Sequence, residues 1–179
     1  MRGGVVIVTA VLAVAWLGPP ALRAEEKSVG LGAGVVTGED QYGHPLWLTA
    51  NVRISLGRGL VLEPELGFWK GQRAPLDLLV EFHDLHLGAS LLWGFRWHRL
   101  EPFLGGGAGT HRFDFGRGSG FHLGAHALAG FDVRASERTN LFAAARYEWI
   151  HDRAPKDGPA RYYTDLDLMR FYGGLRFRF

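Results

Sequence analysis

The sequence predicts an all-β fold, an eight-stranded antiparallel up-and-down β-barrel that spans a membrane and is preceded by a signal peptide. Three observations predict it. Eight segments alternate apolar and non-apolar residues with a period of two, which is typical of strands. After residue 24, no apolar run approaches the ~20 residues that a membrane-spanning helix needs. The apolar faces end in aromatic side chains, as in the girdles of transmembrane barrels.

The N-terminal segment has the features of a secretory leader. Arg2 precedes an apolar run over residues 5–17, and Ala24 supplies a small residue before the expected cut. A positive start, a short apolar core and a small residue at the cut are typical of a signal peptide, and the run is too short for a spanning helix. We therefore expect a cleaved signal peptide over 1–24 and one barrel domain over 25–179.

Removing this leader makes the chain electrically neutral. The whole sequence has 20 Lys and Arg against 18 Asp and Glu, and the leader's two arginines account for the excess. A neutral mature chain gives no reason to expect a nucleic-acid partner. The chain has no cysteine, so an exported domain must be stabilised by packing and hydrogen bonds instead of disulfides.

The first four predicted strands follow in chain order. Residues 29–37 set Val, Leu and Ala against glycines, and residues 46–56 set Leu, Val and Ile against Trp, Thr, Asn, Arg and Ser. Residues 60–69 alternate Leu and Phe with Glu and Gly, although Pro64 falls on the apolar face and removes one ladder donor. Residues 85–97 form a long alternation that ends in Trp and Phe.

The remaining four strands complete the set. Residues 102–113 are strand-like, but glycines at 105–107 leave their inward face ambiguous. Residues 121–133 alternate Phe, Leu, Ala and Val with His, Gly and Asp, and residues 140–150 alternate Leu, Ala, Tyr and Trp with Arg and Glu. Residues 168–179 are apolar on one face and rich in arginine on the other.

The connections between these segments alternate in length. Short turns are expected at 57–59, 98–101 and 135–139. Longer polar loops are expected at 38–45, 70–84, 114–120 and 151–165. Short turns on one side and long loops on the other match an outer-membrane barrel whose turns lie in the periplasm.

Several stretches carry a resemblance to a known class of proteins. With "EPELGF" at 63–68, "EPFLGGGAG" at 101–109, the alternation and the terminal "RFRF", the sequence resembles the small outer-membrane barrels of the OmpA and OmpX kind over 28–179. The resemblance implies the outer membrane of a Gram-negative-type bacterium, contact with its lipid and lipopolysaccharide, and the barrel-assembly machinery as a partner during insertion. It also implies a C-terminal insertion signal made of Phe171, Leu175, Phe177 and Phe179.

Polar side chains on the inward faces predict a lumen closed by salt bridges, because eight strands enclose only enough room for side chains. A turn centred on Arg58 places Arg53 opposite Glu63 and Asn51 opposite Glu65. A proton or ion path is the alternative use of these groups. The predicted lumen network consists of Arg53, Glu63, Glu65, Arg96, His126, Asp132, Arg146, Glu148 and Arg170, with His86, His122 and Arg176 as further interior candidates.

No metal or other cofactor is expected. His122 and His126 stand four residues apart, which on a strand separates them by ~13 Å at ~3.3 Å per residue, too far for one ion. The glycine-rich stretches at 30–38 and 105–110 match neither the dinucleotide-binding fingerprint nor the P-loop. In a barrel these glycines relieve crowding and allow curvature.

One segment suggests an enzyme. Residues 145–165 resemble the lipid A 3-O-deacylase family, in which His151 matches the family's histidine and Asp165 falls near its acidic partner. Arg153 stands where the family has serine, and without that hydroxyl a Ser–His pair cannot transfer an acyl group. The predicted function is therefore a non-catalytic barrel that acts in envelope integrity or in surface contact through its loops, with lipid A deacylation as the alternative.

Overall fold

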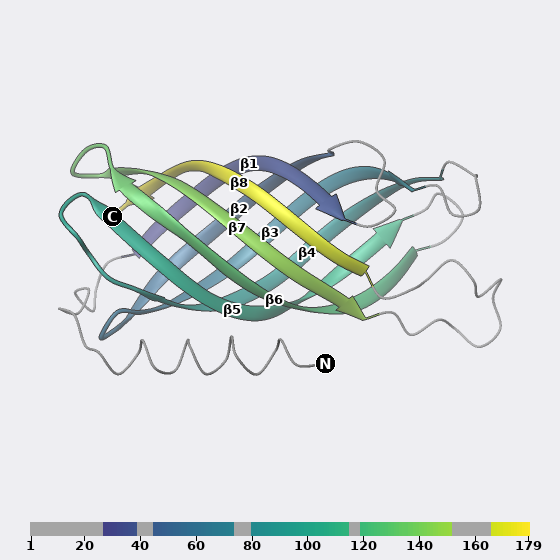
Figure 1. Cartoon of the computed structure of the whole chain (residues 1–179), viewed down its shortest axis with the longest axis horizontal. Coiled ribbons are helices and arrows are strands. Elements are labelled where there is room, and N and C mark those ends of the chain that lie inside the picture. The colour runs from purple at the N-terminus through teal and green to yellow at the C-terminus, as the bar shows by residue number, and fades with distance from the viewer. Residues whose placement is uncertain (1–26, 39–44, 74–79, 115–118, 152–165) are drawn as a thin grey trace.

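The strands form one closed barrel in the computed structural model, which describes residues 27–38, 45–73, 80–114, 119–151 and 166–179 (Figure 1). Each strand pairs antiparallel with its neighbours in chain order, and β1 closes the barrel on β8. The strands are β1 (Lys27–Gly38), β2 (Leu46–Gly57), β3 (Leu60–Arg73), β4 (Val80–Gly94), β5 (Leu100–Asp114), β6 (Ser119–Arg134), β7 (Thr139–His151) and β8 (Leu166–Arg178).

The two ends of the barrel differ in their connections. At one end Phe179 N donates a hydrogen bond of 3.1 Å to Lys27 O, so the start of β1 and the end of β8 lie together (Figure 1, left). We call this the hairpin end, because the connections 58–59, 95–99 and 135–138 also lie there. The opposite end, which we call the loop end, is where the strands meet the undescribed segments 39–44, 74–79, 115–118 and 152–165.

The predicted fold class is confirmed, but one predicted connection is wrong. β3 continues to Arg73 and β4 begins at Val80, so most of the expected loop 70–84 is a strand pair. Lys70 pairs with His83 in this extension. The alternation of apolar and polar residues stops there, but the hydrogen bonds between β3 and β4 continue. The two strands therefore extend beyond the apolar band of the barrel. Among the described residues, no helix is long and apolar enough to cross a membrane.

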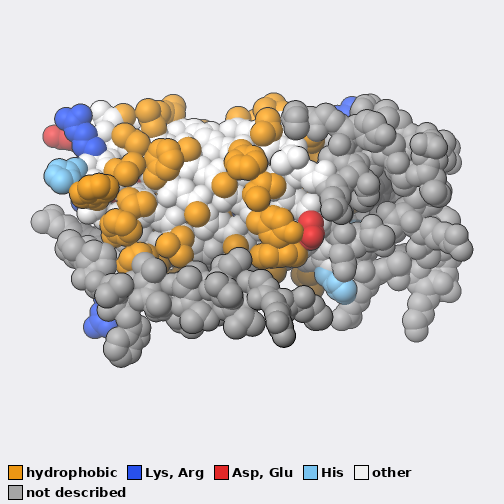
Figure 2. Space-filling view, viewed as in Figure 1, with side chains coloured by type: hydrophobic (Ala, Val, Ile, Leu, Met, Phe, Trp, Pro, Cys, Tyr) orange, Lys and Arg blue, Asp and Glu red, His pale blue; other side chains and the backbone are white. Residues whose placement is uncertain are grey.

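Large apolar side chains cover the outside of the barrel, and the charged side chains in view lie toward its ends (Figure 2). Leu87 and Leu123 expose 61% and 70% of their surface. An exterior with so many exposed large apolar side chains suits lipid rather than water. The exposed aromatic residues form the two expected girdles, Trp97, Phe131, Phe177 and Phe179 at the hairpin end and Phe68, Phe121, Trp149 and Phe171 toward the loop end.

Side chains fill the inside of the barrel. Trp47 and Trp69 pair across β2 and β3, and both are fully buried. Gly67 makes room for the Trp47 ring, because a Cβ at that position would overlap it. The sequence left the inward face of residues 102–113 ambiguous. In β5 the odd-numbered residues, such as Phe103 and His111, are buried and face inward.

Candidate functional site: an ion-pair network across the lumen

Two arginines and two carboxylates form a closed ring in the hairpin half of the lumen. Arg53 Nε donates to Glu63 Oε2 at 2.5 Å, and Arg53 Nη1 donates to Asp132 Oδ2 at 2.5 Å. Arg176 contacts the same two acids, with Nη2 3.2 Å from Glu63 Oε2 and Nη1 on Asp132 Oδ1. Each charge in this hairpin-side quartet therefore meets two opposite charges, which offsets much of the cost of removing four ions from water.

Aromatic rings support both guanidinium groups of the quartet. The Arg53 guanidinium carbon lies 4.1 Å from the centre of the Phe103 ring, and that of Arg176 lies 4.5 Å from the centre of the Phe142 ring. A cation over an aromatic face is attracted by the ring's electrons. The rings also fix the planes of the guanidinium groups, so that their N–H bonds point at the carboxylates.

A single ion pair crosses the middle of the lumen. Arg146 Nη1 donates to Glu65 Oε1 at 2.5 Å, and both side chains are about 1% exposed. Arg146 comes from β7 and Glu65 from β3, which are four strands apart around an eight-stranded ring and so face each other across it. The Arg146 guanidinium carbon also lies 5.8 Å from the centre of the Tyr172 ring.

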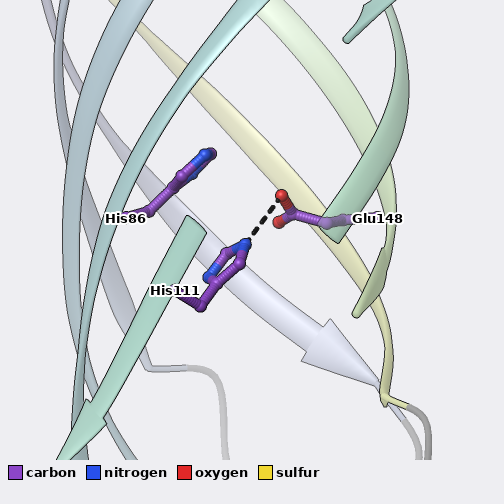
Figure 3. A group of neighbouring side chains, drawn as sticks. All are labelled: His86, His111 and Glu148. Carbon is purple, nitrogen blue, oxygen red and sulfur yellow. Dashed lines mark hydrogen bonds and ion pairs between the residues drawn. The ribbon is translucent and has the colours of Figure 1, made fainter. Parts of the chain in front are cut away.

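A second polar group fills the loop half of the lumen. We call Asp84, His86, His111, Glu148 and Arg170 the loop-side cluster, and the structure buries all five side chains completely. Asp84 Oδ2 lies 2.8 Å from His111 Nδ1. On the other side of the ring, Glu148 Oε1 lies 3.1 Å from His111 Nε2 (Figure 3). Both ring nitrogens of His111 therefore lie within hydrogen-bond distance of a carboxylate, so this side chain bridges Asp84 and Glu148.

Histidine rings pack face to face beside this bridge. The rings of His86 and His111 are stacked, with centroids 4.5 Å apart. Gly88 and Gly109 form a cross-strand pair under His86, and a Cβ on either would overlap the His86 ring. These glycines therefore relieve crowding, as the sequence analysis expected of the glycine-rich segment. His126 Nε2 lies 2.7 Å from Ser90 Oγ, nearer the middle of the lumen.

The loop-side cluster also contains three potential metal ligands. One donor atom from each of His86, His111 and Glu148 lies within 4.8 Å of the others (Figure 3). This group was not predicted, because its members come from three strands, β4, β5 and β7, and no spacing along one strand reveals it. However, Arg170 Nη1 lies 2.6 Å from Glu148 Oε2 and 3.3 Å from His86 Nδ1. A guanidinium therefore occupies the position between two of the donors, and we assign the cluster to ion pairing.

The hairpin end closes with a more exposed group. Glu101 Oε1 accepts hydrogen bonds from Arg96 Nε at 2.7 Å and from Arg178 Nη2 at 2.8 Å, and Arg134 Nη2 lies at 3.5 Å. The side chains of Arg96 and Arg134 are each 34% exposed. Arg96 was predicted inside the lumen, but β4 ends at Gly94, so Arg96 lies on the connection and reaches back to the rim.

The structure places the other predicted lumen residues as follows. Arg53 lies beside Glu63, and Asn51 is the register partner of Glu65. Two buried residues of the lumen were not predicted. Asp84 falls in the expected loop 70–84, and the glycines near His111 leave the inward face of its strand ambiguous in the sequence. The spacing of Asp84 and His86 was the available signal, since residues two apart share a face of a strand.

The remaining predicted residues lie on the outside or beyond the described residues. His151 is exposed at the end of β7, and Asp165 lies outside the described residues, so their pairing in a deacylase stays a prediction. The four residues of the predicted insertion signal point outward and are exposed, and their role also stays a prediction. They are Phe171, Leu175, Phe177 and Phe179.

Comparisons with known proteins identify the fold. No protein-family model matches the chain, and no curated protein matches it significantly in sequence. Among solved structures, Neisserial surface protein A is similar with a TM-score of 0.66 at 17% identity, covering 90% of this chain and 100% of that one. OprG from Pseudomonas aeruginosa gives 0.63 at 14% identity, covering 87% and 96%. A major outer membrane protein from Thermus thermophilus gives 0.53 at 12% identity, covering 86% and 99%. The chain thus has the fold of the small eight-stranded outer-membrane barrels.

Proposed function

We propose that this protein is an outer-membrane barrel whose lumen is closed by ion pairs, and that it acts in envelope integrity or surface contact without transport or catalysis. One observation carries the proposal. Contacts between strands on opposite sides of the ring occur at three levels, and each joins an arginine to a polar partner. They are Arg53 to Asp132, Arg146 to Glu65, and Arg170 to His86.

The free space in the lumen supports a closed barrel. A cavity of about 50 Å³ lies between the hairpin-side quartet and the rim, and a neighbouring one has about 20 Å³. These volumes hold one or a few water molecules. A hydrated ion crossing the barrel would have to break buried contacts at three successive levels, two of which are the ion pairs Arg53–Asp132 and Arg146–Glu65. Breaking one such pair typically costs about 3–5 kcal/mol.

The outer surface and the loops supply the contacts of the proposed role. The exposed apolar band suits outer-membrane lipid, and the loop end would meet lipopolysaccharide. The similar Neisserial protein is described as a surface protein, which supports a role at the cell surface. The barrel-assembly machinery is the expected partner during insertion, through the aromatic residues of β8. The signal peptide over 1–24 would direct export.

Two measurements test this proposal. The first is cell fractionation together with gel mobility before and after boiling. We expect the protein in the outer membrane with a heat-dependent mobility shift, and a soluble periplasmic protein without the shift would overturn the barrel in lipid. The second is conductance of the folded protein in planar bilayers. We expect no steady channels, and large steady channels would overturn the closed lumen.

A variant makes the conductance measurement sharper. Arg146→Ala removes the guanidinium that crosses the middle of the lumen, whereas Arg112→Ala removes an exposed arginine on the outside of β5. We expect brief conductance events to appear or increase only with Arg146→Ala. Identical silent traces for Arg146→Ala would show that other side chains close the lumen without this pair.

A further inference from the structure

We propose that the hairpin end binds anionic phospholipid headgroups through a ring of exposed basic side chains, an inference that rests on the proposed location in a membrane. Four exposed cations lie at this end, one on each connection and one beside the closing seam of the barrel. They are Lys27, Arg58, Arg99 and Arg138.

The positions of these four cations point to lipids around the barrel. Arg58 lies between β2 and β3, Arg99 between β4 and β5, and Arg138 between β6 and β7. Lys27 begins β1, next to the end of β8. Since the strands follow one another around the barrel, the cations lie at four roughly even steps of the rim. A ring of separate cations suits a shell of headgroups better than a single soluble anion, which needs cations that converge.

The described residues at this end carry more exposed positive than negative charge. Within the described part of the chain, Arg58, Arg99 and Arg138 form no ion pair, and the only exposed acidic side chain on the hairpin-end connections is Glu137. Arg96 and Arg134 add partly exposed positive charge, since their common partner Glu101 is itself held by three arginines.

The aromatic girdle sets this charge at the depth of the headgroups. Trp97 is 63% exposed and lies two residues from Arg99, and Phe179 is 74% exposed and bonds to the backbone of Lys27. Aromatic side chains occupy the interface between hydrocarbon and water. Cations immediately beyond them therefore lie at the level of phosphate groups, where each basic residue attracts anionic lipid.

The loop end lacks this imbalance among the described residues. Its exposed charges have both signs, with Lys70 and Arg112 accompanied by Asp114 and Asp167. Among the residues that the structure describes, the excess of exposed positive charge is therefore confined to the hairpin end. With the expected orientation, in which the short turns are periplasmic, the basic rim meets the phospholipid leaflet and not the lipopolysaccharide.

Lipid selectivity of the folded barrel tests the inference. The protein is folded into phosphatidylcholine vesicles that contain spin-labelled phosphatidylglycerol or spin-labelled phosphatidylcholine, and the bound fraction of each label is measured. We expect phosphatidylglycerol to be preferred by about fivefold, the factor that corresponds to the attraction of one basic residue near a membrane surface. Raising the salt to about 1 M should remove most of this preference, because it shortens the Debye length to about 3 Å.

Matched variants locate the preference. The first replaces the four rim cations, with Lys27→Gln, Arg58→Asn, Arg99→Gln and Arg138→Gln; Asn suits the positive φ of 54° at Arg58. The control replaces two loop-end cations, with Lys70→Gln and Arg112→Gln. We expect the first variant to lose the preference and the control to keep it.

Three outcomes overturn the inference. No preference in the wild type, a preference that survives high salt, or one that survives in the four-site variant would each reject the basic rim as a lipid site. If the four-site variant fails to fold, the wild type alone tests the inference: loss of its phosphatidylglycerol preference at about 1 M salt supports the basic rim, and a preference that persists rejects it. Binding of purified peptidoglycan by the wild type, without lipid selectivity, would assign the rim to that polymer instead. Failure of the wild type to insert would reject the proposed function itself, and the heat-dependent gel shift detects this separately.

Discussion

Removing one charge from the hairpin-side quartet should destabilise the barrel strongly. Glu63→Gln keeps the size of the side chain but leaves Arg53 and Arg176 sharing Asp132 alone. Glu63 is 2% exposed and contacts both guanidinium groups at 2.5 and 3.2 Å, so water cannot replace the lost charge. Leaving a buried charge without its partner costs about 3–5 kcal/mol, and we expect the free energy of unfolding to fall by that amount.

Reversible urea unfolding in lipid vesicles, followed by tryptophan fluorescence, measures this loss. The double variant Arg53→Met with Glu63→Gln restores charge balance, keeps apolar contact with Phe103 and retains the Arg176–Asp132 pair. It should therefore lose less stability than Glu63→Gln alone, because a neutral, well-packed replacement of a buried pair is often tolerated. A loss below about 1 kcal/mol for Glu63→Gln would refute the reasoning. So would a loss in the double variant that equals the sum of the losses of Arg53→Met alone and Glu63→Gln alone.

Three further predictions follow from other parts of the barrel. Glu101→Gln removes a carboxylate that is 12% exposed but whose partners Arg96 and Arg134 are each 34% exposed. It should therefore cost about 1 kcal/mol, less than Glu63→Gln, and raising the salt concentration during urea unfolding should shrink that cost. Leu87→Arg, in the middle of the outward face of β4, should cost about 2–4 kcal/mol in vesicles, whereas Leu60→Arg at the hairpin end should cost about 0–1; equal costs would contradict a membrane across the apolar band. Arg170→Met removes the guanidinium from between Glu148 and His86, so Zn²⁺ should raise the urea midpoint of this variant and leave that of the wild type unchanged.

The fold could be predicted because alternation in a barrel is set locally. Successive side chains on a strand point to opposite faces, so Leu87 faces outward where His86 faces inward. The alternation can therefore be recognised in each strand separately. The register of the β2–β3 hairpin was readable for the same reason, since a tight turn restricts which residues pair. Asn51 pairs with Glu65 and Ser55 with Val61 as predicted, but a bulge between Ser55 and Gly57 shifts the pairing next to the turn. Strand alternation and hairpin register together are enough to predict an eight-stranded barrel with Asn51 opposite Glu65.

The partners across the lumen could not be predicted in this way. Glu65 and Arg146 are 81 residues apart, and their meeting depends on the tilt and stagger of all the strands between them. The face of β5 was hidden because its glycines carry no side chain to reveal inward or outward direction, which concealed His111. Asp84 was missed because a strand that continues beyond the apolar band carries polar residues, and the sequence alone does not distinguish such residues from a loop.

Because β1 pairs with β8 along its length, the strands of the barrel have a cyclic order, and Phe179 and Lys27 lie side by side where it closes. A short linker across this junction, with the chain opened at 135–138, would give a circular permutant that ends on β6 and keeps all eight strand pairs. Such a permutant separates stability from targeting, because the aromatic residues of β8 would then lie inside the chain. Folding in vesicles without insertion in cells would assign those aromatic residues to recognition by the assembly machinery alone.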